Sequence, residues 1–351
     1  MSEEGELVGG DVSAAASERA ESLVGKTLIG RYRIEELVAM GGIAAVFRAT
    51  KLATGEEVAL KTLHPDAEEM PELIKRFQRE AIAGRHILHP NVAAVMESAQ
   101  LEDGSWFMVM EFIHGVTLRH VMRKGPFTPA RATRVALQIA AALNAAHDLG
   151  IIHRDVKPLN VMVVEGPEEQ VKLIDFGLAK VPVDELALPD ENSRTTLTHS
   201  GVVFGTVAYM APEAALGMRS VEKRSDLYAL GVILYEMLAG KHPFPASDSY
   251  SMFAQHRNAV PPPIAQRSPG VTVPPALEAV VQRLLAKDPD DRFPNARALM
   301  VALEAALQEM VAAESKSQTI EGRLGVPRTA LIVGVVVLAL LTGFLAWRYG
   351  F

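Results

Sequence analysis

The sequence of 351 residues contains no cysteine, which excludes disulfide bonds and thiolate metal sites and suits a reducing compartment. It also lacks an excess of basic residues, since the formal net charge is −7 at pH 7. Proteins whose main partner is nucleic acid usually carry a basic face, so we expect no nucleic-acid partner. The N-terminal residues lack the basic and then apolar pattern of a secretory signal peptide, and no internal repeat is visible.

Long apolar runs are almost absent, and the one exception lies near the C-terminal end. Residues 329–347, TALIVGVVVLALLTGFLAW, carry no charge and would form a helix roughly 28 Å long. A helix of that length in a soluble core normally shows a polar face, and this segment has none. We therefore predict a transmembrane helix over residues 329–347, followed by a short extracytoplasmic tail of residues 348–351.

The basic residues around this segment are unevenly distributed. Lys316, Arg323 and Arg328 precede it, and Arg348 alone follows it. The positive-inside tendency therefore places residues 1–328 in the cytoplasm. We expect a single-pass protein of the plasma (inner) membrane that contacts the lipid bilayer through this one span.

In the stretch IIHRDVKPLNVMVV, over residues 151–164, two apolar runs bracket a loop that holds a carboxylate, a lysine and an amide. A second carboxylate, Asp175, follows in the stretch LIDFG. Two short strands that each deliver an acid or an amide to one place suit a centre that binds Mg²⁺ and phosphate. Asn160 and Asp175 would then be metal ligands, Asp155 would lie near an attacking hydroxyl, and Lys157 would neutralise the phosphate. The alternative is two buried hairpin ends with incidental polar residues.

The pattern His-Arg-Asp-x-x-x-x-Asn at residues 153–160, followed by Asp-Phe-Gly, resembles the catalytic and metal-binding loops of the protein kinases. The resemblance covers about residues 32–304. Lys157, two residues after the aspartate, implies specificity for serine and threonine rather than tyrosine. Together with a single C-terminal span, the motifs look like the membrane-bound eukaryotic-like Ser/Thr kinases of bacteria.

The resemblance implies an α+β, two-lobed protein kinase fold plus a C-terminal transmembrane helix. A small β-rich lobe with one key helix would cover residues 32–113, and a large helical lobe residues 114–304. Residues 1–31 are rich in Glu, Ser, Ala and Gly, and we predict a disordered acidic leader there. Residues 305–328 are predicted to form the end of a helix and then a polar linker.

The first hairpin departs from the glycine pattern of the family. In the kinases it carries Gly-x-Gly-x-x-Gly and covers the nucleotide phosphates, because backbone without a Cβ can approach oxygens closely. Here only the middle position, Gly41, is glycine, and Ala39 and Ala44 stand at the outer positions. We expect the hairpin still to close, with weaker phosphate contact. The resemblance assigns these residues of the hairpin and the next strand to the ATP pocket: Val38, Ala39, Met40, Gly41, Gly42, Ala44, Val46 and Ala59.

Lys61 lies at the end of an apolar strand, where a lysine usually needs an acidic partner. By resemblance it holds the α- and β-phosphates. The spacing of apolar residues predicts a helix over residues 71–88, with Pro71 near its start. Glu80 lies beside the apolar stripe and is expected to pair with Lys61. The alternative is a glutamate exposed to solvent.

The segment from Trp106 to Ile113 reads as a buried strand that runs into a connector. By resemblance, Met110 guards the back of the adenine pocket. The backbones of Glu111 and Ile113 would bond the adenine edge. Backbone contacts leave little signature in the side chains, so these assignments depend on the resemblance.

The segment between Asp-Phe-Gly and Ala-Pro-Glu is long for this family and polar in its middle. Such a loop can be ordered by a phosphate that pairs with an arginine, and Arg154 beside the catalytic aspartate is the natural partner. We predict autophosphorylation at one of Thr195, Thr196 or Thr198. The alternative is an ordinary loop rich in Ser and Thr.

Other motif positions imply structural roles. Thr206 is expected to bond Asp155 and Lys157 rather than to accept phosphate. Glu213 needs a buried arginine, and Arg292 stands at the matching position.

The helix that precedes Gly240 is strongly apolar. We expect Ser225 and Asp226 to cap its start and Gly240 to end it. Asp226 also matches the aspartate that steadies the catalytic-loop backbone, and the two roles do not exclude each other. Further helices are predicted over residues 128–150, 276–287 and 295–312.

The implied reaction is in-line transfer of the ATP γ-phosphoryl group to a Ser or Thr hydroxyl of a protein. Asp155 would orient and deprotonate the hydroxyl, while Lys61 and Mg²⁺ (or Mn²⁺) would hold the phosphates and Lys157 would stabilise charge in the transition state. A homodimer is left open. Two alternatives remain: a pseudokinase scaffold, suggested by the missing outer glycines, and a membrane adaptor that only senses ATP. The sequence indicates neither the protein substrates nor the activating signal.

Overall fold

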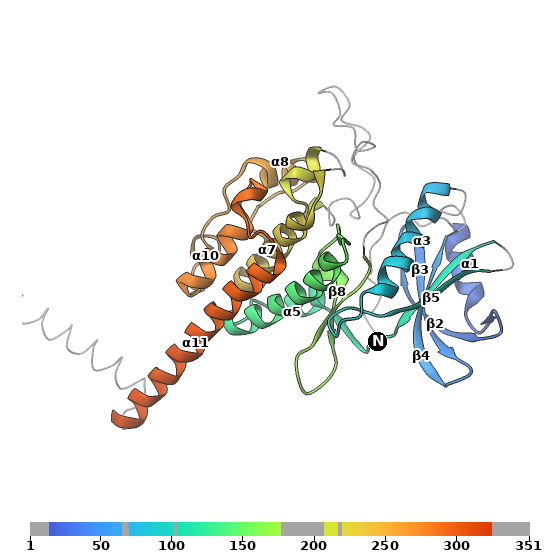
Figure 1. Cartoon of the computed structure of the whole chain (residues 1–351), viewed down its shortest axis with the longest axis horizontal. Helices are drawn as coiled ribbons and strands as arrows, with labels where there is room; N and C mark the ends of the chain where they lie inside the picture. Colours follow the sequence, from blue (N-terminus) through green and yellow to red (C-terminus); the bar gives the residue numbers. More distant parts are fainter. Residues whose placement is uncertain (1–13, 65–69, 102–103, 177–206, 217–219, 325–351) are drawn as a thin grey trace, which may run out of the picture. The chain divides into compact units, whose positions relative to one another are not determined.

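The computed structural model describes residues 14–64, 70–101, 104–176, 207–216 and 220–324. The chain divides into two compact units, residues 1–303 and 304–351. The first unit contains a six-stranded sheet, a three-stranded sheet and a group of helices (Figure 1).

The six-stranded sheet is antiparallel, with the strand order β1-β2-β3-β4-β6-β5. Its strands are β1 (Thr27–Leu28), β2 (Tyr32–Met40), β3 (Ala44–Lys51), β4 (Glu56–Leu63), β5 (Val95–Gln100) and β6 (Trp106–Glu111). Side chains that alternate along the strands, among them Ile34, Phe47 and Leu60, form one buried cluster. Helix α3 (Pro71–His86) packs on the other side, where Phe77 contacts a second cluster. The small lobe predicted from the sequence is therefore confirmed.

The leader predicted to be disordered contains ordered structure. Residues Ala14–Leu23 form helix α1, and β1 pairs with β2. Ala16 and Ala20 are buried, and Ala20 joins the cluster of the sheet. Alanine has a high helix propensity. Ala16 and Ala20, four positions apart, also form a narrow apolar face. The helix can therefore pack on the sheet without large apolar side chains. The prediction of disorder is wrong for residues 14–28, and residues 1–13 lie outside the described residues.

The elements that follow the six-stranded sheet along the chain are mainly helical. Its helices are α4 (Leu118–Met122), α5 (Pro129–Asp148), α7 (Lys223–Ala239), α8 (Ser249–Asn258), α9 (Ile264–Arg267), α10 (Pro275–Leu284) and α11 (Ala296–Leu324), with 3₁₀ turns η1 (Pro158–Asn160), η3 (Pro212–Leu216) and η5 (Pro289–Asp291). A small antiparallel sheet joins them, in the order β7 (Gly115–Thr117), β8 (Val161–Val164) and β9 (Val171–Leu173). The predicted helices over 128–150 and 276–287 correspond to α5 and α10.

Helix α7 is buried on nearly all sides, as its uniformly apolar sequence predicts. A Cβ on Gly231 would lie 2.6 Å from the Cβ of Leu284, so glycine lets α10 approach closely. Gly240 ends the helix with φ 65°, as predicted. The helix begins earlier than predicted, because Glu222 is the N-cap and Ser225 closes a capping box with it.

Helix α11 continues into the predicted polar linker and ends at Leu324. Residues 313–324 are polar but consist largely of good helix formers and contain no proline, so polarity alone misassigned them. Within the part of the chain that the structure describes, no helix is long and apolar enough to cross a bilayer. The predicted span over residues 329–347 lies outside those residues.

Candidate active site

Lys61 joins three elements that are far apart in the sequence. It lies on the inner strand β4, opposite Val46 of β3 and Met108 of β6. Its Nζ lies 3.0 Å from Glu80 Oε1 on α3 and 2.9 Å from Asp175 Oδ1 after β9. The Lys61 and Glu80 side chains are 11% and 5% exposed, so the pair is buried. The predicted pair is confirmed, and the alternative of an exposed Glu80 is wrong.

Burial and the neighbouring charges act in opposite directions on the pKa of Lys61. Burial lowers the pKa of Lys61, but Asp175 and Glu80 outweigh burial and hold the pKa above its ordinary value. Burial raises the pKa of Glu80 to about 6, although Lys61 opposes the shift. Lys61 therefore stays charged, and Glu80 titrates closer to neutral pH than an ordinary glutamate does.

The loop before β8 is held by Asp226 of α7. One carboxylate oxygen accepts from the N–H of His153 at 2.9 Å, and the other accepts from the N–H of Arg154 at 2.8 Å. Arg154 has φ 63°, an unfavourable conformation for a side chain of this size. The predicted contact of Asp226 with the catalytic-loop backbone is confirmed, and it stabilises this left-handed residue. Asp226 is not an N-cap, because α7 begins at Lys223.

His153 connects this loop to the Asp175 strand. Its Nε2 donates to the carbonyl oxygen of Ile174 at 3.2 Å, and its ring lies 4.8 Å from that of Phe176. Burial lowers the pKa of His153, which keeps the imidazole neutral. A neutral ring that donates through Nε2 accepts through Nδ1, and the N–H of Asp155 lies 3.3 Å from that atom.

The polar residues predicted around the metal meet in one place. Lys157 Nζ lies 2.9 Å from Asp155 Oδ2. The side-chain amide of Asn160 donates to the backbone oxygen of Asp155 at 2.8 Å and to Oδ2 at 3.2 Å. The N–H of Ile174, next to Asp175, donates to the backbone oxygen of Asn160 at 2.9 Å. Strands β8 and β9 therefore bring the two loops together, and Asp175 adopts φ 54° at the end.

The hairpin between β2 and β3 closes without the outer glycines. The N–H of Gly41 donates to Ala44 oxygen at 2.9 Å, and Ala39 is paired with Val46. No residue from 39 to 44 has a positive φ, so alanine fits both outer positions. The prediction that the hairpin closes is confirmed. Val38, Ala39 and Met40 lie on β2, Gly41 and Gly42 in the turn, Ala44 and Val46 on β3, and Ala59 on β4 opposite Met110.

His64 is a residue of this hairpin that the motifs did not indicate. It follows β4 and is buried, and its Nε2 donates to Gly41 oxygen at 2.7 Å. Its own N–H donates to Ile43 oxygen at 2.9 Å. The side chain and backbone of His64 therefore both hold the turn between β2 and β3. Nothing in the residues around it distinguishes this histidine in the sequence.

Met110 and Glu111 end β6, and Ile113 follows it. The N–H of Glu111 donates to Ala94 oxygen at 2.9 Å, and its carboxylate lies 2.7 Å from Lys172 Nζ. The backbone group of Glu111 that can still bond an adenine edge is therefore its carbonyl. Thr195, Thr196, Thr198 and Thr206 lie outside the described residues, so the roles predicted for them stay predictions.

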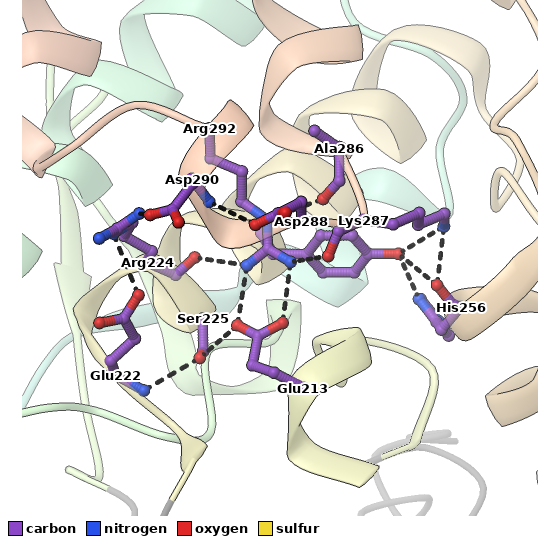
Figure 2. Close-up of polar contacts among 11 residues, drawn as sticks. Glu213, Glu222, Arg224, Ser225, His256, Ala286, Lys287, Asp288, Asp290 and Arg292 are labelled. Carbon is purple, nitrogen blue, oxygen red and sulfur yellow. Dashed lines mark hydrogen bonds and ion pairs between the residues drawn. The ribbon is translucent and has the colours of Figure 1, made fainter. Parts of the chain in front are cut away.

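Glu213 and Arg292 form the predicted buried pair, shown in Figure 2. Both carboxylate oxygens of Glu213 accept from the guanidinium at 2.8 Å, and Ser225 Oγ donates to one of them at 2.6 Å. Burial raises the pKa of Glu213, but Arg292 outweighs it and holds the pKa below its ordinary value. Arg292 also donates to three carbonyl oxygens, those of Arg224, Ala286 and Lys287.

Residues 32–302 match the family model described as protein kinase domain. The serine/threonine-protein kinase pkn3 of Myxococcus xanthus is 38% identical over 292 residues, which are 82% of this chain and 52% of that protein. The chain belongs to the protein kinase family. It spans about half the length of the curated relatives it matches.

Two solved structures show the same fold. The crystal structure of the Mycobacterium tuberculosis PknI kinase domain has a TM-score of 0.59 at 24% identity, and the match covers 80% of this chain and 98% of that one. The crystal structure of Rad53 1-466 in complex with AMP-PNP has a TM-score of 0.62 at 25% identity, with 78% and 66% covered. The two-lobed protein kinase fold predicted from the motifs is thus confirmed.

Removing the guanidinium should unfold the helical lobe more easily. We expect Arg292→Met to lower the free energy of unfolding by about 3–5 kcal/mol, because Glu213 is left as a buried, unpaired charge. The double variant Glu213→Gln/Arg292→Met should recover part of the loss. Urea denaturation followed by circular dichroism measures both.

The matched control is Arg224→Met, which breaks pairs with two exposed carboxylates, those of Asp290 and Glu222, and should cost about 0–1 kcal/mol. A loss for Arg292→Met no larger than that of the control would contradict the role of the buried pair.

Proposed function

We propose that this chain is a serine/threonine protein kinase that transfers the γ-phosphoryl group of ATP to Ser or Thr hydroxyls of proteins. The observation that carries the proposal is the position of Lys61 between Glu80 and Asp175, with Asp155, Lys157 and Asn160 on the adjoining loop. A fixed ammonium beside two carboxylates suits a triphosphate, and the neighbouring aspartate suits a hydroxyl. The names of the relatives and the AMP-PNP bound by Rad53 support the same reading.

The residues fit a magnesium or manganese ion. The Asn160 amide nitrogen already donates to Asp155, so Oδ1 of Asn160 is the atom left for a metal. Asp175 offers a second hard oxygen. Mg²⁺ keeps several waters and binds through substrate phosphates, so two protein ligands are sufficient. When bound there, the ion would neutralise the phosphate oxygens.

The remaining chemistry belongs to positioned side chains. Lys61 would bind phosphate oxygens while Glu80 fixes its direction. Asp155, oriented by Asn160, would accept the proton of the incoming Ser or Thr hydroxyl. Lys157 is held 2.9 Å from that carboxylate, so its charge lies where the transferred group passes. Most of the acceleration would come from positioning and electrostatics.

The structure of the β2–β3 hairpin gives no support to the pseudokinase alternative, which was suggested by its missing outer glycines. Its turn closes with alanine at both outer positions, and every charged or amide residue named by the motifs is present. We further propose that the chain phosphorylates itself at Thr195, Thr196 or Thr198, with Arg154 as the partner of the phosphate.

Single substitutions at the reacting residues should strongly reduce phosphoryl transfer. We expect Asp155→Asn, Lys61→Met and Asp175→Ala each to lower the rate of label transfer from ATP in the presence of Mg²⁺ by about 10²- to 10⁴-fold. The purified full chain is assayed for self-labelling and for labelling of an added protein, and phosphopeptide mapping locates the label. Asp290→Asn, at an exposed carboxylate, is the control. Undiminished transfer by Asp155→Asn would overturn the proposed function.

Glu80 should control how ATP binding depends on pH. As the pH falls through about 6, Glu80 gains a proton and the ion pair that fixes the direction of Lys61 weakens, so the KM for ATP should rise. The folded-state pKa lies above the ordinary value, so proton uptake favours the folded state and does not destabilise it. In Glu80→Gln the KM should be high throughout and should lack this inflection. If the KM for ATP depended on pH in the same way in wild type and in Glu80→Gln, Glu80 would not be the titrating group. Circular dichroism at each pH checks that both proteins stay folded.

We also propose that residues 329–347 anchor the chain in the plasma (inner) membrane with residues 1–328 in the cytoplasm. The support is the uncharged apolar sequence and the excess of basic residues before it.

Anchoring predicts that the full chain remains in the membrane pellet after a carbonate wash. Val336→Arg/Leu340→Arg should release it, because each arginine at the centre of a span costs about 2.5–3.5 kcal/mol. Val311→Arg, at an exposed position of α11, should remain in the pellet. Release of the unmodified chain would show that this segment is no anchor.

A further inference from the structure

We infer that His256 and His242 are positioning residues that hold the loop of residues 207–211 where a protein substrate reaches Asp155. The inference rests on the proposed kinase function and deepens it. Neither histidine belongs to the motifs that indicated the active site, and neither touches the residues around Lys61.

Both histidines bind the same carbonyl group. Nε2 of His256, on α8, lies 2.8 Å from Ala208 oxygen, and Nε2 of His242, in the loop after α7, lies 2.7 Å from it. A carbonyl oxygen only accepts, so both imidazoles donate through Nε2 and together use its two lone pairs. His256 is fully buried and Ala208 is 7% exposed, so water does not readily replace the His256 donor.

The second nitrogen of each ring is also occupied. Nδ1 of His242 accepts from the N–H of Phe244 at 3.1 Å. Nδ1 of His256 lies 2.9 Å from the hydroxyl of Tyr228, which must therefore donate to it. Lys287 Nζ donates to that hydroxyl at 3.2 Å and to the backbone oxygen of His256 at 2.7 Å (Figure 2). The hydrogen bonds run in one direction, from Lys287 through Tyr228 and His256 to Ala208.

This direction requires neutral imidazoles. Burial, His242 and Lys287 lower the pKa of His256 to about 3, and burial also lowers the pKa of His242. Both rings therefore keep one donor and one acceptor across the physiological range. The two imidazoles therefore hold Ala208 as neutral donors.

The clamped loop forms a wall of the space beside Asp155. A small cavity of about 30 Å³ is lined by Asp155 of the catalytic loop, by Tyr209 and Met210 of the clamped loop, and by Asp226 and Ala229 of α7, so the clamped loop packs beside the loop that carries Asp155. The residues that flank a hydroxyl presented to Asp155 would therefore pass close to this loop. The position of the loop therefore affects how the protein substrate binds.

The two ends of the loop are fixed to one support. Ala208 is held by the histidines, and Glu213, just beyond the loop, is held by Arg292. Lys287 joins these anchors, because its backbone oxygen accepts from Arg292 at 3.0 Å while its ammonium group bonds His256 (Figure 2). Loosening the clamp should therefore weaken peptide binding and leave the ATP site unchanged.

The test compares Michaelis constants of the full chain for ATP and for the peptide that it labels fastest in a threonine-centred library. We expect His256→Leu to raise the peptide KM about three- to tenfold, the effect of one lost hydrogen bond, with the ATP KM unchanged. His256→Gln should restore most of the loss, because the glutamine amide can donate to Ala208 from a similar position. The double variant His242→Leu/His256→Leu should exceed the product of the single effects, since the carbonyl then has no donor.

Two tyrosines of α7 supply a matched pair in case His256→Leu does not fold. Tyr228→Phe removes the hydroxyl that bonds His256, whereas Tyr235→Phe removes a buried hydroxyl that bonds Pro262 oxygen instead. Only the first should raise the peptide KM.

The inference would be overturned if wild type, His256→Leu and Tyr228→Phe had the same KM for the peptide. It would also be overturned if the variants raised the KM for the peptide and the KM for ATP equally. Absence of any labelled peptide with the wild-type chain would instead overturn the proposed function on which the inference depends.

Discussion

The structure of the site depends on one buried ammonium group, that of Lys61, shared by two carboxylates. Neither carboxylate can be removed without leaving charge unbalanced in a buried place, so strand β4, helix α3 and the loop after β9 are held in register. Phe77 and Ala81 pack α3 against the sheet, and this packing places Glu80 within reach of Lys61. Packing of apolar residues in the small lobe thus determines the electrostatics of the site.

The helical lobe uses buried charges in the same way. Asp226 holds the N–H groups of a loop in an unfavourable conformation, and Arg292 joins Glu213 to three carbonyl oxygens. Each charge is surrounded by several hydrogen bonds, which offsets the cost of its burial. The result is a rigid frame under the loops that carry Asp155 and Asp175.

The charged pairs were predictable because a charge in an apolar segment needs a partner, and the motifs supplied the candidates. Helix α1 was not, because its buried face consists of alanines that give no periodic signal. His64 and His256 were missed for a different reason: a neutral histidine that donates to a backbone carbonyl follows no sequence pattern. The start of α7 was misplaced because Ser225 suits an N-cap and an N3 position equally well. The extent of α11 was underestimated because polar residues can form a helix as readily as a linker.

The central claim is that the group around Lys61 binds the triphosphate of ATP and that Asp175 acts there through a metal ion. Calorimetric titration of the full chain with ATP, with and without Mg²⁺, tests it most directly on the wild type and Asp175→Asn. The account predicts that Mg²⁺ tightens ATP binding to the wild type by about 5- to 150-fold and has little effect on the variant. An equal effect of Mg²⁺ on both proteins would contradict it.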